Sequence, residues 1–202
     1  MQTELHYDTV FDAQQHFRLL LDSMARPGKI NTFSSSDILP PAGLNQGAAL
    51  TGFALLNADT NYYIIGENRV DIAAYLLVNT AAQQVGIDMA DYIFLPENHD
   101  GQGLDEARTG TPVYPEDSAT LIAAAELVSA EATEGALSIT LNGPGVNGEA
   151  IAYIKGINPK LLDYIKEQNS EYPLGIDLII TDRQNNLLCI PRSNRFTYIQ
   201  TN

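Results

Sequence analysis

The sequence has few residues of several kinds, and each scarcity excludes a class of protein. Cys189 is the single cysteine among 202 residues, which excludes an intramolecular disulfide and a cysteine-based zinc site. Eleven Lys and Arg stand against 25 Asp and Glu, a formal charge of −14 that would repel a nucleic-acid backbone. No apolar run reaches the roughly 18 residues of a membrane span, and residues 1–10 have no signal-peptide core. We therefore expect a cytoplasmic protein without nucleic-acid or membrane partners.

The sequence also lacks the short motifs of several enzyme classes. It has neither a G-x-x-x-x-G-K-[ST] phosphate loop nor a G-x-S-x-G nucleophile turn. Its three histidines, His6, His16 and His99, are too widely spaced to form a metal-ligand pair. We expect His16 on a helix, at the surface or as a packing residue, and His99 in an exposed loop. Cys189 lies in the apolar run LLCIP and is expected to be a buried, inert thiol.

The spacing of apolar residues predicts a mixed α/β protein that forms one domain over residues 1–202. Helices are predicted over 9–26, about 45–57, 68–79 and 158–169, with a shorter one beginning near 104. Strands are predicted over 61–66, about 84–88, 92–96, 136–141 and 150–156, followed by a β-hairpin over 175–194. Residues 120–129 suit either a helix, by their alanines, or a buried strand, by their alternation.

Three of the helices have recognisable start signals. Thr9 with Asp12 three residues later resembles a capping box. Asn68 can cap the helix that follows it. Asn158 followed by Pro159 combines a capping side chain with proline in the first turn, which is a strong helix start.

The stretch ITLNGPGVNGEA, residues 139–150, contains the letters of a dinucleotide-binding loop, G-x-G-x-x-G. Such a loop must run from a strand directly into a helix, whose amide groups meet the pyrophosphate. Here Pro144 removes one backbone donor, and residues 150–156 are strand-like. We therefore predict a tight turn between two strands.

The cationic side chains suggest two further possibilities. None of the four lysines lies in an apolar setting that would lower its pKa, so none is a good Schiff-base candidate. Arg26 ends a helix, and Arg192 and Arg195 follow a hydrophobic strand through Pro191. Arginines at such positions form phosphate clamps or structural ion pairs, and ion pairs are the commoner outcome in so acidic a chain.

Several stretches together resemble one protein family. They are FRLLLDSMARPG (17–28), ARTGTPVYPEDSATLI (107–122), LNGPGV (141–146) and YPLGIDLIITD (172–182), followed by LLCIPRSNR (187–195). In order and spacing these resemble PhnH, a subunit family of the bacterial carbon–phosphorus lyase system. The resemblance implies an α/β/α sandwich similar to the large domain of pyridoxal-phosphate-dependent transferases. It also implies that the cofactor and its lysine are lacking.

The resemblance implies a function within an assembly. Members of this family work in a core complex with the G, I and J subunits and are expected to form homodimers when isolated. The assembly transfers the ribose 5-triphosphate moiety of ATP to methylphosphonate and displaces adenine, for which the G, I and L proteins are also required. Catalysis is attributed to other subunits, so this chain is expected to assist and not to be catalytic alone.

The resemblance also marks a candidate ligand or interface cluster, formed by Arg26, Glu116, Ser118, Asp177 and Arg192. Asp177 places a charge in an apolar strand and needs a partner, which Arg26 or Arg192 could supply. An ion pair would make the cluster architectural. Two alternatives stay open: an independent phosphate- or nucleotide-binding protein or enzyme that uses arginines at strand ends, and a degenerate pyridoxal-phosphate enzyme.

Overall fold

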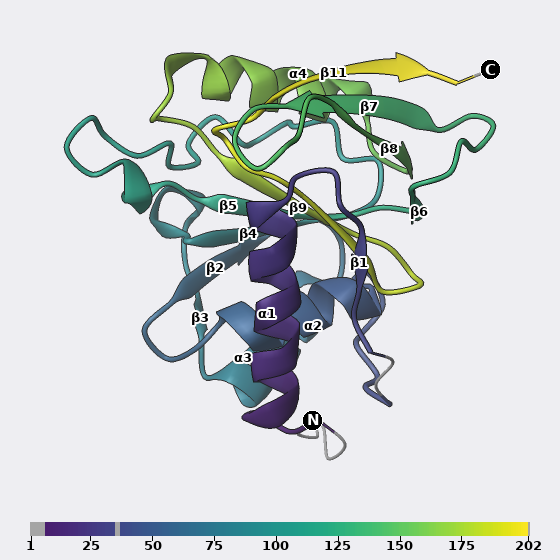
Figure 1. Cartoon of the computed structure of the whole chain (residues 1–202). Helices are drawn as coiled ribbons and strands as arrows, with labels where there is room; N and C mark the ends of the chain where they lie inside the picture. Colours follow the sequence, from purple (N-terminus) through teal and green to yellow (C-terminus); the bar gives the residue numbers. More distant parts are fainter. Residues whose placement is uncertain (1–6, 35–36, 202) are drawn as a thin grey trace.

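A seven-stranded sheet crosses the middle of the computed structural model, which describes residues 7–34 and 37–201 (Figure 1). The helices are α1 (Phe11–Ala25), α2 (Gln46–Leu55), α3 (Arg69–Thr80) and α4 (Pro159–Gln168), with short 3-10 turns η1 (Ile87–Met89), η2 (Pro115–Asp117) and η3 (Asn169–Glu171). The strands are β1 (Asn31–Thr32), β2 (Asn61–Ile64), β3 (Gln83–Gln84), β4 (Tyr92–Leu95), β5 (Thr120–Ala124), β6 (Leu127–Ser129), β7 (Leu137–Asn142), β8 (Ala150–Lys155), β9 (Asp177–Thr181), β10 (Asn186–Ile190) and β11 (Arg195–Gln200).

The strands form two sheets of different character. The large sheet has the order β1-β10-β9-β5-β4-β2-β3, in which β9, β5, β4, β2 and β3 are parallel to one another. Strand β10 is antiparallel to both of its neighbours, β9 and β1. The small sheet has the order β11-β7-β8-β6 and is antiparallel throughout. The mixed α/β prediction is therefore confirmed.

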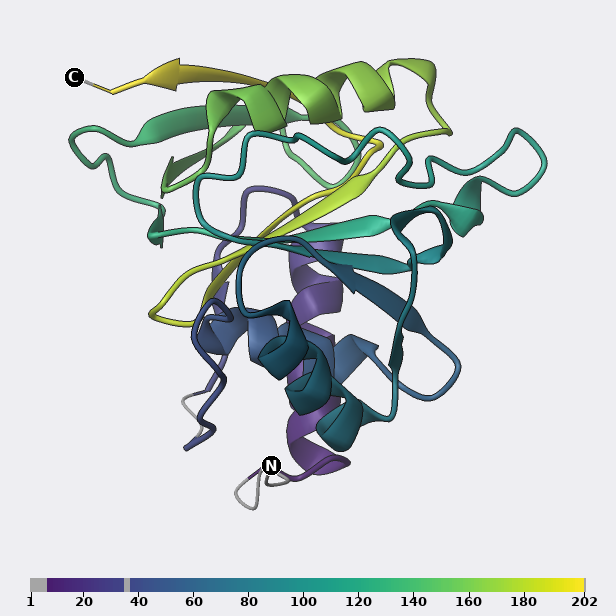
Figure 2. The same ribbon diagram turned by 180° about the vertical axis from the view of Figure 1, so that it is seen from behind.

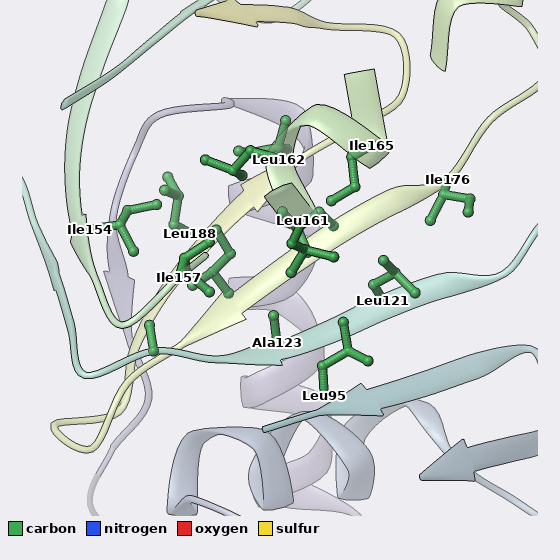
Figure 3. Close-up of a cluster of buried hydrophobic side chains, with 14 of the residues drawn as sticks. Leu95, Leu121, Ala123, Ile154, Ile157, Leu161, Leu162, Ile165, Ile176 and Leu188 are labelled. Carbon is green, nitrogen blue, oxygen red and sulfur yellow. The ribbon is translucent and has the colours of Figure 1, made fainter. Parts of the chain in front are cut away.

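The central strands of the large sheet have buried side chains on both faces. Successive side chains of a strand point to opposite sides, so each of these strands contributes to two cores. In β4, Ile93 and Leu95 face one core cluster, and Phe94 between them faces the other. The first cluster continues into Leu161, Leu162 and Ile165 of α4, as Figure 3 shows, and into β7 and β8. The second cluster contains buried residues of α1, α2 and α3.

The two faces are covered differently. Helices α1, α2 and α3 lie on one face, and the other face carries α4 beside the small sheet (Figures 1 and 2). The α/β/α sandwich implied by the resemblance would have helices alone on each face of the sheet. The face that carries α4 and the small antiparallel sheet differs from that arrangement. No helix within residues 7–34 and 37–201 is both long and apolar enough to cross a bilayer.

The predicted helix starts have mixed outcomes. Asn158 accepts a hydrogen bond from the Lys160 amide at 3.0 Å, which confirms that start. The prediction that Thr9 caps the first helix is wrong. The Asp8 carboxylate accepts from the amides of Val10 and Phe11, and the Asp12 carboxylate accepts from the Asp8 amide at 2.9 Å. The prediction that the Asn68 side chain caps α3 is also wrong. Asn68 has a left-handed backbone conformation, and its side-chain amide donates to the Ala42 carbonyl at 3.2 Å.

Residues 120–129, which suited either a helix or a buried strand, form two strands, β5 and β6, that belong to different sheets. The buried-strand alternative is confirmed in β5. Two other short segments depart from the predictions. The helix predicted near 104 is absent from the described residues there, which form turns. The strand predicted at 84–88 is shortened to β3, and η1 follows it. In each case long-range pairing or loop packing overrides a weak local preference.

The glycine-rich stretch is the turn between β7 and β8, as predicted. Gly143, Gly145 and Gly148 have φ angles of 128°, 80° and 80°, in the region that favours glycine. A Cβ on Gly145 would overlap the carbonyl oxygen of Ala25 at the end of α1, whereas a Cβ on Gly148 would meet open space. The first two glycines of this turn therefore serve packing, and no helix follows them for a pyrophosphate to meet.

Gly145→Ala should lower the free energy of unfolding by about 3 kcal/mol or more, because backbone strain adds to the overlap with Ala25. Gly148→Ala has the same φ and an open side, so it should cost about 1 kcal/mol. Urea unfolding of both variants measures the difference. Equal losses would contradict the proposed contact between the turn and α1.

His16 is a packing residue beside the second core cluster, which confirms one of the two positions predicted for it. It is 1% exposed, and its ring nitrogens lie 3.3 Å from the Tyr7 hydroxyl and 3.2 Å from the Ser34 hydroxyl. Burial lowers the pKa of His16, and the nearby Asp12 carboxylate opposes that shift only in part. His99 lies in a loop as predicted but is half-buried, and His6 lies outside the described residues.

The folded protein should lose stability as the pH falls below 6.5, since the unfolded chain protonates His16 more readily than the folded one does. His16→Gln should therefore show a shallower fall in unfolding free energy between about pH 7 and pH 5. The pKa of His99 is also lowered by burial, but His99 is present in both proteins and cancels in the comparison. Parallel pH profiles for the two proteins would contradict this role.

Candidate functional site

The predicted cluster forms where β9 begins and β10 ends. These antiparallel neighbours pair Leu178 with Ile190, so the residues that precede Leu178 and follow Ile190 lie at the same end of the pair. Asp177 directly precedes Leu178, and Arg192 lies two residues after Ile190. The backbone amide of Arg192 donates to Asp177 Oδ1 at 2.8 Å, and its Nε lies 3.8 Å from Asp177 Oδ2. Of the two partners that the sequence allowed for Asp177, the structure has Arg192.

The Arg192 guanidinium also holds the loop that precedes β5. Its Nη1 donates to the Pro115 carbonyl at 2.6 Å and to the Ser118 hydroxyl. A longer contact of 3.4 Å joins the same nitrogen to the Gly175 carbonyl. One side chain thus connects residues 115–118 with the start of β9 and the end of β10.

Partial burial makes these bonds important. The side chains of Arg192 and Asp177 are 18% and 23% exposed, so both charges are largely removed from water. Such charges must be compensated by partners of opposite sign and by hydrogen bonds. The pair is not bidentate, and the carbonyls of Pro115 and Gly175 and the Ser118 hydroxyl supply the remaining acceptors.

Arg26 lies elsewhere. It pairs with Asp22, one turn earlier, and its side chain is 62% exposed. Asp22 also binds Lys29 at 2.6 Å and the Asn31 side-chain amide at 2.9 Å. The structure therefore brings four of the five predicted residues together and leaves Arg26 in a separate surface network at the end of α1.

A shallow hollow of about 340 Å³ adjoins the four clustered residues. It is lined by Asp59, Thr60, Asp91, Tyr92, Glu116, Ser118, Thr120, Asp177 and Arg192. These residues lie at the amino ends of the parallel strands, whereas ligands of open α/β sheets bind beyond the carboxyl ends. An anion would also meet four carboxylates here, of which Asp91 is paired with Arg108. The hollow does not suit a phosphate clamp.

The cluster offers little acid–base or nucleophilic chemistry. The Ser118 hydroxyl accepts from Arg192, and no histidine among the residues that line the hollow could act as its base. Cys189 is fully buried, and burial raises the pKa of its thiol, which keeps it inert. Within residues 7–34 and 37–201, no three His, Cys, Asp or Glu side chains come close enough to hold a metal ion.

The loop that carries Ser118 is folded tightly on itself. Thr109 forms an isolated antiparallel bridge with Ser118, and its carbonyl accepts from the Gly175 amide at 2.9 Å. A Cβ on Gly110 would lie 2.6 Å from the Pro115 carbonyl oxygen. These glycines belong to the stretches that resemble PhnH, so those stretches supply close backbone packing around Arg192.

The sequence interpretation missed Asp182, a second carboxylate that organises the same strands. It is fully buried at the end of β9 and accepts from the amides of Val128, Gln184 and Asn186 and from the Asn186 side chain, at 2.8–2.9 Å. These bonds shape the β9–β10 turn and attach β6 to it. The signal in the sequence was an aspartate directly after an apolar strand, in the polar run TDRQNN.

Comparisons with known proteins agree with the resemblance. The PhnH family model, described as bacterial phosphonate metabolism protein (PhnH), matches residues 5–197. The chain is 30% identical over 190 residues to a protein of Rhizobium meliloti (strain 1021) named alpha-D-ribose 1-methylphosphonate 5-triphosphate synthase subunit PhnH, covering 93% of this chain and 92% of that protein. It is 26% identical over 169 residues to HtxG of Stutzerimonas stutzeri, named as a candidate C-P lyase subunit protein, covering 83% and 77%.

Arg192→Gln should lower the free energy of unfolding by about 2–3 kcal/mol, because it leaves Asp177 and two carbonyls without their charged partner. Arg183→Gln is the matched control. Arg183 makes two bonds of 2.9 Å to Glu97 but is 64% exposed, so its loss should matter much less. Denaturant titration of both variants provides the measurement. A loss for Arg192→Gln no larger than that of the control would refute an anchoring role.

Proposed function

This chain belongs to the PhnH family, and on that premise we propose that it is an accessory subunit of the carbon–phosphorus lyase core complex. The observation that carries the proposal is the match to the Rhizobium meliloti subunit, which spans nearly the full length of both proteins. Similarity over so much of both chains favours a shared role over a shared fold fragment. The match of the family model over residues 5–197 supports the same conclusion.

The proposed role is assistance to chemistry that other subunits perform. The core complex would transfer the ribose 5-triphosphate moiety of ATP to methylphosphonate and displace adenine, with the G, I and L proteins also required. We expect this chain to contact the G, I and J subunits. Its candidate cluster supports an assisting role, because the bonds of Arg192 to Ser118 and Asp177 join parts of this chain to one another.

We further propose that the fold is related to the large domain of pyridoxal-phosphate-dependent transferases and that residues 1–202 act as one domain without that cofactor. The mostly parallel central sheet supports the relationship. The surroundings of the lysines support the lack of cofactor: Lys29 is paired with Asp22, Lys160 and Lys166 are exposed, and Lys155 is half-buried. The cytoplasmic location and the isolated homodimer stay predictions.

The alternative of an independent phosphate-binding protein that uses Arg26 and Arg192 has less support. The two guanidiniums are engaged by different carboxylates, Asp22 and Asp177, in separate networks. They therefore do not converge on one clamp.

Deletion of the gene should abolish growth of its source organism on methylphosphonate as sole phosphorus source, and growth on inorganic phosphate should be unaffected. Expression of the intact chain should restore growth. A tagged chain should also co-purify with the G, I and J subunits of the same organism. Normal growth of the deletion strain on methylphosphonate, or a tagged chain that elutes without those subunits, would refute the proposal.

A further inference from the structure

A second, larger hollow lies on the other side of Arg192, at the carboxyl end of α4. It has a volume of about 620 Å³ and lies between residues 166–172 and residues 192–197, with Asn142 at the end of β7. Figures 1 and 2 show α4 and β11 side by side, and the Tyr198 hydroxyl joins them through a 2.7 Å bond to Asp163. The hollow is therefore a cleft between elements that are fixed relative to each other.

The charges of this cleft are opposite to those of the protein as a whole. Lys166, Arg192 and Arg195 line it, and no Asp or Glu is among its lining residues. The whole chain carries 25 acidic residues and only 11 Lys and Arg. Charges are screened beyond about 8 Å at physiological salt, so an anion in the cleft would be governed by these three cations more than by the acidic surface.

Most of these cationic groups are available to a ligand. Lys166 and Arg195 are exposed, and within the described residues neither forms an ion pair. The Lys166 ammonium lies 5.7 Å from the centre of the Tyr198 ring, which holds it near β11. Arg192 uses Nη1 for its internal bonds, and its Nη2 donates to no residue of 7–34 or 37–201.

Several nearby features oppose an anion, and among them the exposed Glu167 and Glu171 adjoin the lining segment in sequence but do not line the cleft. Asp177 compensates part of the Arg192 charge. The carboxyl end of α4 carries roughly half a negative charge, which Lys166 in its last turn offsets. Arg195, on β11, forms no ion pair within residues 7–34 and 37–201. The cleft keeps a net positive character.

The geometry points to this cleft as a binding site for a small phosphorylated compound with two or more linked phosphoryl groups. Three cations suit an oligophosphate, and hydroxyls of Ser170 and Thr197 line the same cleft as further donors. The volume lies in the range of small-molecule sites, roughly 300–1,000 Å³, and exceeds the need of a single phosphate. Tyr172, 65% exposed, adds an aromatic face for a ring in the ligand. This inference rests on the cleft alone and does not require the proposed role in the core complex.

Calorimetry of the full chain with inorganic tripolyphosphate and with ATP tests the site. Both should bind, and affinity should fall as salt rises. Lys166→Gln and Arg195→Gln should each weaken binding about tenfold, and the double variant about a hundredfold, as expected for lost charge-assisted hydrogen bonds. Lys160→Gln is the control, because Lys160 lies on the same helix, is exposed and does not line the cleft. The Lys160→Gln protein should bind tripolyphosphate and ATP with the affinity of the wild type.

Amide chemical shifts give a second readout that does not depend on the variants. On addition of tripolyphosphate the shifts should concentrate in residues 166–172 and 192–197. No binding at millimolar tripolyphosphate, shifts confined to other segments, or equal affinity of the wild type and the double variant would overturn the proposal. An acidic peptide of a partner subunit that binds there while tripolyphosphate and ATP do not would overturn it as well.

Discussion

The Arg192 guanidinium makes the interaction on which the surrounding structure depends. It bonds to the Pro115 carbonyl and the Ser118 hydroxyl in one loop, and it faces Asp177 at the start of a core strand. The loop from 108 to 119 contains only η2 and the Thr109–Ser118 bridge as regular structure, so side-chain bonds contribute to fixing it. A largely buried guanidinium can fix such a loop, because the cation needs acceptors and the loop's carbonyl and hydroxyl oxygens need donors. Three of the stretches that resemble PhnH, residues 107–122, 172–182 and 187–195, meet at this point.

Arg192 also separates two hollows of opposite character. On one side lie the amino ends of the parallel strands, with the carboxylates of Asp59, Asp91, Glu116 and Asp177. On the other side lies the cleft at the end of α4, whose ionic lining residues are all cationic. The residue that fixes the loop therefore also forms a wall of the proposed anion site. In this account Arg192 has a structural role in the loop and a binding role in the proposed anion site. Neither role requires a catalytic group.

Local signals predicted the parts of the fold that are local. The Asn158 cap and the turn between β7 and β8 follow from neighbouring residues, and both were predicted correctly. The partner of Asp177 and the role of Asp182 depend on which strands pair, a long-range property that one sequence does not reveal. The cleft was hidden for the same reason, since Arg195 reaches Asn142 only through the pairing of β11 with β7.

Amide hydrogen exchange of Arg192→Gln tests most directly whether Arg192 is the anchor of this site. If it is, residues 108–119 and 172–177 should exchange faster than in the wild type, while the centres of β5 and β9 stay protected, because those strands are held by the core on both faces. Arg183→Gln should leave the same segments unchanged. Unaltered exchange of residues 108–119 in Arg192→Gln would contradict the account.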